Sequence, residues 1–98
     1  EIMECEAARL ESSEQALAGA VKQLREQAVA LDGETDSDFK VAEKLDAAQK
    51  QFAAFIESAC DYESATYTTG TLAGVSYITC KEALISQRLS DINKSLAQ

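Results

Sequence analysis

The chain has 98 residues, of which 46% are apolar, and it contains no histidine, tryptophan or proline. That length suits one small domain, which buries roughly 60 to 65% of the surface that its unfolded chain exposes. Seventeen acidic and nine basic side chains give a net charge of −8. This charge argues against nucleic acid and anionic lipid as partners, since both repel the chain, and it favours a cationic protein. The plainer alternative is a soluble acidic domain whose charge selects no partner.

The composition also bears on the compartment. Three cysteines in a short chain without histidine favour a disulfide over a metal site, and disulfides persist outside the cytoplasm. No apolar run approaches the roughly 20 residues of a membrane span, and the first residues match neither a signal peptide nor a lipidation site. Because the chain begins at Glu1 rather than Met, we expect that an upstream segment is removed. We therefore predict a periplasmic or otherwise extracytoplasmic protein that does not insert this segment into a membrane.

Apolar residues that recur every seven positions predict a first helix over residues 3–31. The repeating positions are Met3, Leu10, Leu17, Leu24 and Leu31. The companion positions of the same stripe hold Ala7, Val21 and Ala28. Gly33 then ends this helix, and the cluster of residues 36–38 is predicted to cap the next one.

Two further apolar stripes predict the second and third helices. The second stripe holds Val41, Leu45, Ala48, Phe52, either Phe55 or Ile56, and Ala59, and it ends near Cys60. We expect Phe52 and Phe55 to form the centre of the core. The third stripe holds Val75, Ile78, Ile85, Leu89, Ile92 and Leu96. Because the first connection is short, neighbouring helices are antiparallel, and the predicted fold is an all-α, up-down-up three-helix bundle forming one domain over residues 1–98.

In this topology, the three cysteines lie at one end of the bundle. Cys5 starts the first helix, Cys60 ends the second and Cys80 follows the start of the third, so each of the three pairings is sterically conceivable. We favour Cys60 with Cys80, which leaves Cys5 free or paired upstream of Glu1. That bridge stabilises the chain by about 3 kcal/mol in the loop-entropy account. A reactive thiol at Cys5 needs a base or cation beside it, which the sequence does not identify, so an unpaired structural cysteine is the favoured interpretation.

The segment from Asp61 to Gly74 is predicted to be a loop tethered by that disulfide. Its candidate binding residues are Asp61, Tyr62, Glu63, Tyr67, Thr68, Thr69 and Gly70. Tyrosine buries a large area at small entropic cost, and the two acidic residues favour a cationic surface. The alternative, of equal weight, is a connector whose tyrosines pack back onto the protein's own helices.

Glu14 interrupts the companion positions of the first stripe, where an apolar residue is expected. We predict that Arg88 of the third helix pairs with it, as a partly buried ion pair that specifies packing. A role in binding is the second interpretation. A catalytic carboxylate pair is the third, but no histidine and no second carboxylate on the stripe support it.

Several of these residues follow a familiar order: Gln49, Phe52, Cys60, Gly70, Cys80, Leu84 and Arg88, preceded by Cys5, Glu14 and Leu17. In this order the chain resembles the lysozyme inhibitor LprI-like domain family of bacteria, over most of its length. It departs from the family pattern where Phe52 replaces a tryptophan, Ile56-Glu57 an arginine-aspartate pair, and Ala18 an asparagine. A further cysteine that the family pattern has before the first helix is absent from this stretch or lies upstream of Glu1. The resemblance implies an exported helical domain, and inhibition of lysozyme-like enzymes is proposed for some members.

Together these features favour a binding protein that blocks the cleft of a lysozyme-type peptidoglycan hydrolase. Two alternatives are an immunity protein against one cell-wall toxin and an assembly module that binds a partner or a second copy of itself as a homodimer. We do not expect an enzyme, because no nucleophile with a base, metal-ligand set or phosphate-binding loop stands out. We accordingly predict no catalytic residues, metal or cofactor.

Overall fold

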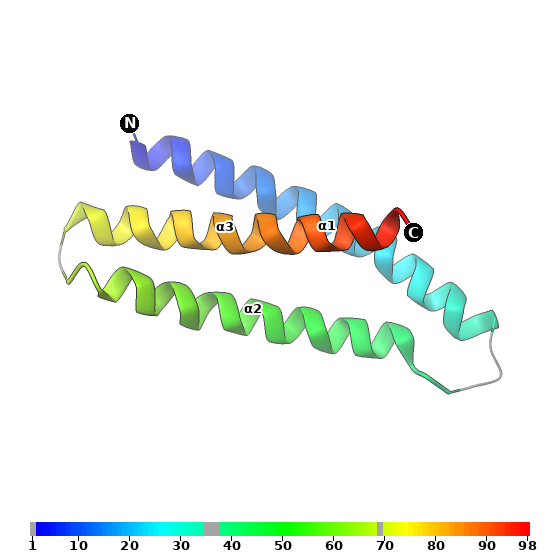
Figure 1. Ribbon diagram of the computed structural model, residues 1–98. Coiled ribbons are helices and arrows are strands. Elements are labelled where there is room, and N and C mark those ends of the chain that lie inside the picture. The colour runs from blue at the N-terminus through cyan, green and yellow to red at the C-terminus, as the bar shows by residue number, and fades with distance from the viewer. Residues whose placement is uncertain (1, 35–37, 69) are drawn as a thin grey trace.

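The computed structural model describes residues 2–34, 38–68 and 70–98. It contains three helices, α1 (Ile2–Glu34), α2 (Val41–Ala65) and α3 (Thr71–Leu96). Helices α2 and α3 run antiparallel side by side, and α1 crosses them obliquely (Figure 1). The molecule is elongated, with extents of 56 × 22 × 15 Å. The predicted all-α, up-down-up arrangement is confirmed. None of the described helices is both long enough and apolar enough to cross a membrane.

Most of the apolar stripe of α1 faces the other helices, including the predicted companion position Ala28, but Leu31, near the end of the helix, is 49% exposed. Leu10 and Leu17 pack against the core, and Ala20 and Ala28 are buried. Ala7, however, is exposed. The reason is geometric. In a helix, the side chain three residues after a core position and the side chain four residues after it lie on opposite sides of the apolar stripe. The side toward α3 is therefore taken by positions such as Ser13 and Ala20.

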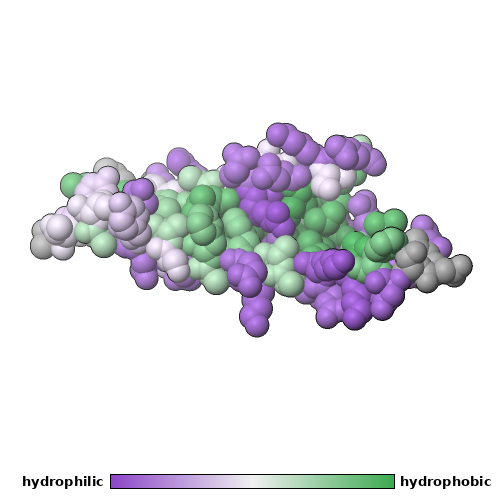
Figure 2. All heavy atoms as spheres, turned by 60° about the horizontal axis from the view of Figure 1, so that its bottom comes forward, coloured by the Kyte–Doolittle hydropathy of each residue, from purple (hydrophilic) through white to green (hydrophobic). Residues whose placement is uncertain are grey.

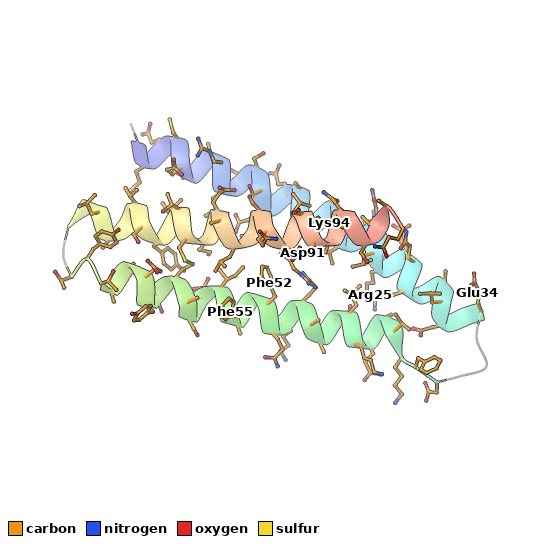
Figure 3. The ribbon with its side chains drawn as sticks, in the orientation of Figure 1. Arg25, Glu34, Phe52, Phe55, Asp91 and Lys94 are labelled. Carbon is orange, nitrogen blue, oxygen red and sulfur yellow. A yellow bond between two sulfur atoms is a disulfide. The ribbon has the colours of Figure 1, made fainter. Side chains whose placement is uncertain are left out.

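The core is small and centres on Ile56, Cys60 and Ile85. Packed against these three residues are Leu10, Leu17, Phe52, Tyr77, Cys80 and Leu84. Phe52 lies between α2 and α3 (Figure 3) and packs against this core, but it is only partly buried and does not form its centre as predicted. The prediction for Phe55 is wrong, because 57% of its surface is exposed. Ile56, four residues after Phe52, repeats the core-facing direction, whereas Phe55 is rotated toward solvent.

The start of α2 is capped from α1 rather than from the connection. The Asp32 carboxylate accepts hydrogen bonds from the backbone N–H groups of Val41, at 2.8 Å, and Ala42, at 3.1 Å. These groups are among the four that a helix leaves unpaired at its start. The sequence predicts that residues 36–38 cap α2. In the structure Asp32 provides the cap, and Asp36 and Ser37 lie outside the described residues. The helix α1 also continues through Gly33 to Glu34.

We expect Asp32→Ala to lower the melting temperature at pH 7 and to make stability less dependent on acid pH. Hydrogen bonds from Ala42 and then Val41 lower the pKa of Asp32 below its ordinary value of 3.8. Its contribution is therefore present above that value and is lost as pH falls through the lowered folded pKa. Thermal denaturation at several pH values measures the effect. Asp38→Ala, an exposed carboxylate near the same helix start, is the control; equal shifts in the two variants would contradict the cap.

The connection between α2 and α3 is shorter than predicted. Helix α2 continues to Ala65 and α3 begins at Thr71, so the turn comprises residues 66–70 instead of the segment from Asp61 to Gly74. No proline or glycine interrupts the stretch from Asp61 to Ala65, and the Cys60–Cys80 disulfide holds the preceding turn of α2 against α3. The turn ends at Gly70, whose φ of 85° and ψ of −169° belong to a region that essentially only glycine adopts.

Two glycines are expected to respond in opposite directions to alanine. Gly19→Ala should raise the free energy of unfolding by roughly 0.5 to 1 kcal/mol, because Gly19 is helical and its added Cβ meets no atom within 4 Å. Gly70→Ala should lower it by roughly 1 to 3 kcal/mol because of its backbone angles. Urea denaturation distinguishes the two variants, and a shift of the same sign in both would contradict this account.

Candidate functional site

A disulfide joins α2 to α3 near the turn. Cys60 and Cys80 are bonded, their Cα atoms are 5.6 Å apart, and Cys60 has no exposed surface. Cys5 is free and exposed. The favoured pairing is therefore confirmed. The start of α1 lies at the same end, since a Cβ placed on Gly74 would come within 2.7 Å of Met3 Cε.

A polar network beside the disulfide links α2 to α3. The Glu57 carboxylate accepts a hydrogen bond of 2.7 Å from the Tyr77 hydroxyl and one of 3.2 Å from Lys81 Nζ. The Lys81 ammonium also lies over the Tyr77 ring, 5.2 Å from its centroid. The hydrogen bond from Tyr77 and, to a smaller extent, the one from Lys81 lower the pKa of Glu57. The two helices are thus held together next to the turn by covalent and polar contacts.

Arg88 has a different partner from the one predicted. Its Nε donates a hydrogen bond of 2.9 Å to Gln49 Oε1, and its guanidinium lies 5.6 Å from the centroid of the Phe52 ring. The predicted ion pair of Arg88 with Glu14 is wrong. Arg88 faces α2, whereas Glu14 is exposed and shares with Lys81 the rim of a groove between α1 and α2. Gln49 and Arg88 therefore lock the α2–α3 pairing farther from the turn.

The predicted binding residues lie on two elements rather than one loop. Asp61, Tyr62 and Glu63 belong to the last turns of α2, while Tyr67, Thr68 and Gly70 lie in the turn. All six are exposed, and Thr69 lies outside the described residues. The turn also has local hydrogen bonds, from Thr66 Oγ1 to Glu63 O at 2.7 Å and from the Tyr67 N–H to Ser64 O at 3.1 Å.

Some of these residues line a groove between α2, the turn and α3. This hairpin groove has a volume of about 610 Å³. Its walls include Tyr62, Glu63, Tyr67, Leu72, Val75 and Thr79. Tyr62 is 70% exposed, Tyr67 47% and Leu72 65%, so three large side chains with apolar area gather on one exposed surface. On the face shown in Figure 2, the most hydrophobic residues lie along the middle of the molecule and toward the end away from the turn, between hydrophilic ones, and the turn end is of intermediate hydropathy.

Sequence reasoning missed two parts of this surface. Leu72 was placed within the loop without a role, although an isolated leucine beside a threonine-rich turn is a signal of exposed apolar area. Phe55 was assigned to the core. Phe55, Ala59 and Tyr62 recur at intervals of four and three residues and so share one face of α2. That face leads from the middle of α2 to the hairpin groove.

The groove between α1 and α2 has a similar volume of about 610 Å³, but its character differs. Its floor includes the core residues Leu17, Phe52 and Ile56. Two of its polar rim residues engage in ion pairs, Lys81 with Glu57 and Arg25 with Asp46. Arg25 makes two hydrogen bonds of 2.9 Å to Asp46, joining α1 to α2. Arg25 and Lys81 thus link neighbouring helices at the rim of this groove, whereas the hairpin groove presents its large side chains to solvent.

The hairpin groove offers aromatic rings, aliphatic side chains and hydroxyl groups. Such a surface is suited to burying the side chains of a protein partner. In the described part of the chain, no three cysteine, aspartate or glutamate side chains gather closely enough to hold a metal ion.

A comparison with known protein families identifies the family of this chain. The model of the family described as lysozyme inhibitor LprI matches residues 1–92. The chain belongs to the lysozyme inhibitor LprI family. The match covers α1 and α2 and all but the last residues of α3, so the resemblance in cysteine and helix order is confirmed. Membership in the LprI family implies a lysozyme inhibitor role, which is a binding role. Searches of curated proteins and of solved structures gave no match.

Proposed function

We propose that this chain is an exported domain that inhibits a lysozyme-like peptidoglycan hydrolase by covering its glycan-binding cleft. The match to the LprI family over residues 1–92 is the observation that carries the proposal. The hairpin groove, with exposed Tyr62, Tyr67 and Leu72, supports it as the contact surface. Inhibition then needs no chemistry, because a protein that occupies the cleft excludes the substrate.

The shape of the α2–α3 hairpin supports insertion of the turn. The described residues of the turn, 66–68 and Gly70, lie at one end of an elongated molecule, between the end of α2 and the start of α3 (Figure 1). The disulfide and the Glu57 network brace the helices beside this turn. A braced turn loses little conformational entropy on binding, so more of the contact energy is retained as affinity. Tyr67 is the residue of the turn that can bury the most area.

The charge of the chain and the compartment that its disulfide suggests agree with a lysozyme-like partner. The chain's net charge of −8 favours a cationic surface. A buried disulfide suits an oxidising compartment, where peptidoglycan hydrolases act. We therefore place the inhibitor in the periplasm or elsewhere outside the cytoplasm.

The test is the clearing rate of a peptidoglycan suspension by a c-type lysozyme, measured with increasing molar ratios of the oxidised protein. We expect dose-dependent slowing that saturates near one inhibitor per enzyme. Unchanged clearing at a large excess would contradict the proposal for this enzyme class. The function would then be immunity against a dedicated toxin or assembly, and concentration-dependent mass in light scattering would identify a homodimer.

A further inference from the structure

Charged side chains are distributed unevenly along the bundle. We define the hairpin half as residues 2–14 and 57–82. Three contacts bring these segments together: the Cys60–Cys80 disulfide, the approach of Met3 to Gly74, and a hydrogen bond of 2.9 Å from Ser13 Oγ to Glu82 Oε2. The acidic residues of the hairpin half are Glu4, Glu6, Glu11, Glu14, Glu57, Asp61, Glu63 and Glu82, and its basic residues are Arg9 and Lys81.

The hairpin half therefore has a net charge of −6, from eight acidic and two basic side chains. The remaining described residues, 15–34, 38–56 and 83–98, contain seven acidic and seven basic side chains and are neutral overall. Both basic residues of the hairpin half are paired within it, Arg9 with Glu6 at 3.5 Å and Lys81 with Glu57 at 3.2 Å. The net charge of the described chain thus lies at the end that holds the hairpin groove.

Negative charge and apolar area meet at the groove itself. Glu63 lines it, and Asp61 directly precedes Tyr62 on the exposed end of α2. No ion pair is found for Asp61 or Glu63 within the described ranges. Unpaired carboxylates around an apolar surface repel acidic partners and attract basic ones before contact is made.

We propose that the hairpin half is a docking surface selective for hydrolases with a basic surface around the cleft. This inference rests on the proposed function and adds where the charge acts and which residues govern association and dissociation. The carboxylates orient the elongated molecule and raise the association rate constant, while Tyr62, Tyr67 and Leu72 determine how slowly the complex dissociates. Hydrolases with neutral or acidic surfaces are inhibited weakly, because they gain the apolar contact without the steering.

Paired charge variants test which residues govern association. The double variant Asp61→Asn with Glu63→Gln removes two charges from the hairpin half. The control, Glu26→Gln with Glu43→Gln, removes two exposed charges from the neutral half. Association and dissociation rate constants with immobilised c-type lysozyme are measured at roughly 20 and 200 mM salt. We expect the first variant to associate about 3- to 10-fold more slowly at low salt, with a smaller difference at high salt because of screening, and both variants to dissociate like wild type.

Lysozyme whose lysines are acetylated provides the second probe, since acetylation removes the positive charge. We expect the wild-type protein to bind it at least 10-fold more slowly than unmodified lysozyme. Equal association rates for the two double variants, or for the two lysozyme forms, would overturn this inference while leaving inhibition intact. Failure of the wild-type protein to bind unmodified lysozyme would instead overturn the proposed function and the inference with it.

Discussion

Replacing both Cys60 and Cys80 with alanine is expected to lower the melting temperature by roughly 12 to 24 °C. The bridge closes a segment with a sequence separation of 20 residues, which in the loop-entropy account corresponds to about 3 kcal/mol. For a domain of this size, each kcal/mol shifts the midpoint by roughly 4 to 8 °C. Cys60 also belongs to the buried core, so its truncation removes packing as well.

The control for this experiment is Cys5→Ala, which removes the free, exposed thiol. We expect its melting temperature to match wild type when both are followed by circular dichroism. A double variant as stable as Cys5→Ala would show that helix packing alone holds the hairpin. Because the disulfide braces the turn, the double variant should also inhibit less well at temperatures where it remains folded.

Tyr67→Ala is expected to weaken inhibition by roughly 10- to 30-fold with almost no change in stability. Truncating an aromatic anchor at an interface costs about 1.4 to 2 kcal/mol, which corresponds to that factor. Tyr67 is 47% exposed and lies outside the helices, so few intramolecular contacts are lost. Inhibition constants come from the clearing assay, and thermal denaturation verifies that the variant is folded.

Phe39→Ala is the matched control, because Phe39 is an aromatic residue that is 58% exposed near the start of α2, away from the turn. We expect it to inhibit like wild type. If Tyr67→Ala and Phe39→Ala inhibit equally well, the contact surface does not include the tip of the hairpin. Tyr62→Ala then shows whether the end of α2 provides the contact instead.

The effects expected for the cysteine and Tyr67 variants distinguish residues that fix the geometry of the hairpin from residues that contact the partner. The disulfide, the Glu57 network and the Gln49–Arg88 pair act on the geometry of the hairpin. In the proposed function, the exposed residues of the hairpin groove contact the partner. Substitutions that remove the disulfide, the Glu57 network or the Gln49–Arg88 pair should therefore change both stability and inhibition. Substitutions of exposed groove residues should change inhibition alone.

Much of the architecture follows from the sequence by itself. Apolar residues at intervals of three, four and seven, without any proline, determined the three helices and their order. Up-down-up order placed all three cysteines at one end, where Cys60 and Cys80 are bonded. The same cysteines, read together with the order of Gln49, Phe52 and Arg88, pointed to the LprI family. These features depend on the spacing of residues along the chain, which can be read directly from the sequence.

Only the tertiary structure decided the contacts that depend on rotation about a helix axis or on a neighbouring element. A rotation of about 100° per residue separates buried Ile56 from exposed Phe55 and inward Ser13 from exposed Glu14. Helix α2 continues past Asp61 to Ala65, where the sequence predicts a loop, and a carboxylate from α1, Asp32, caps α2. Arg88 took Gln49 as its partner because its side of α3 faces α2. An apolar stripe indicates which side of a helix is covered, but the packed neighbours determine which of its residues are buried and what each of them touches.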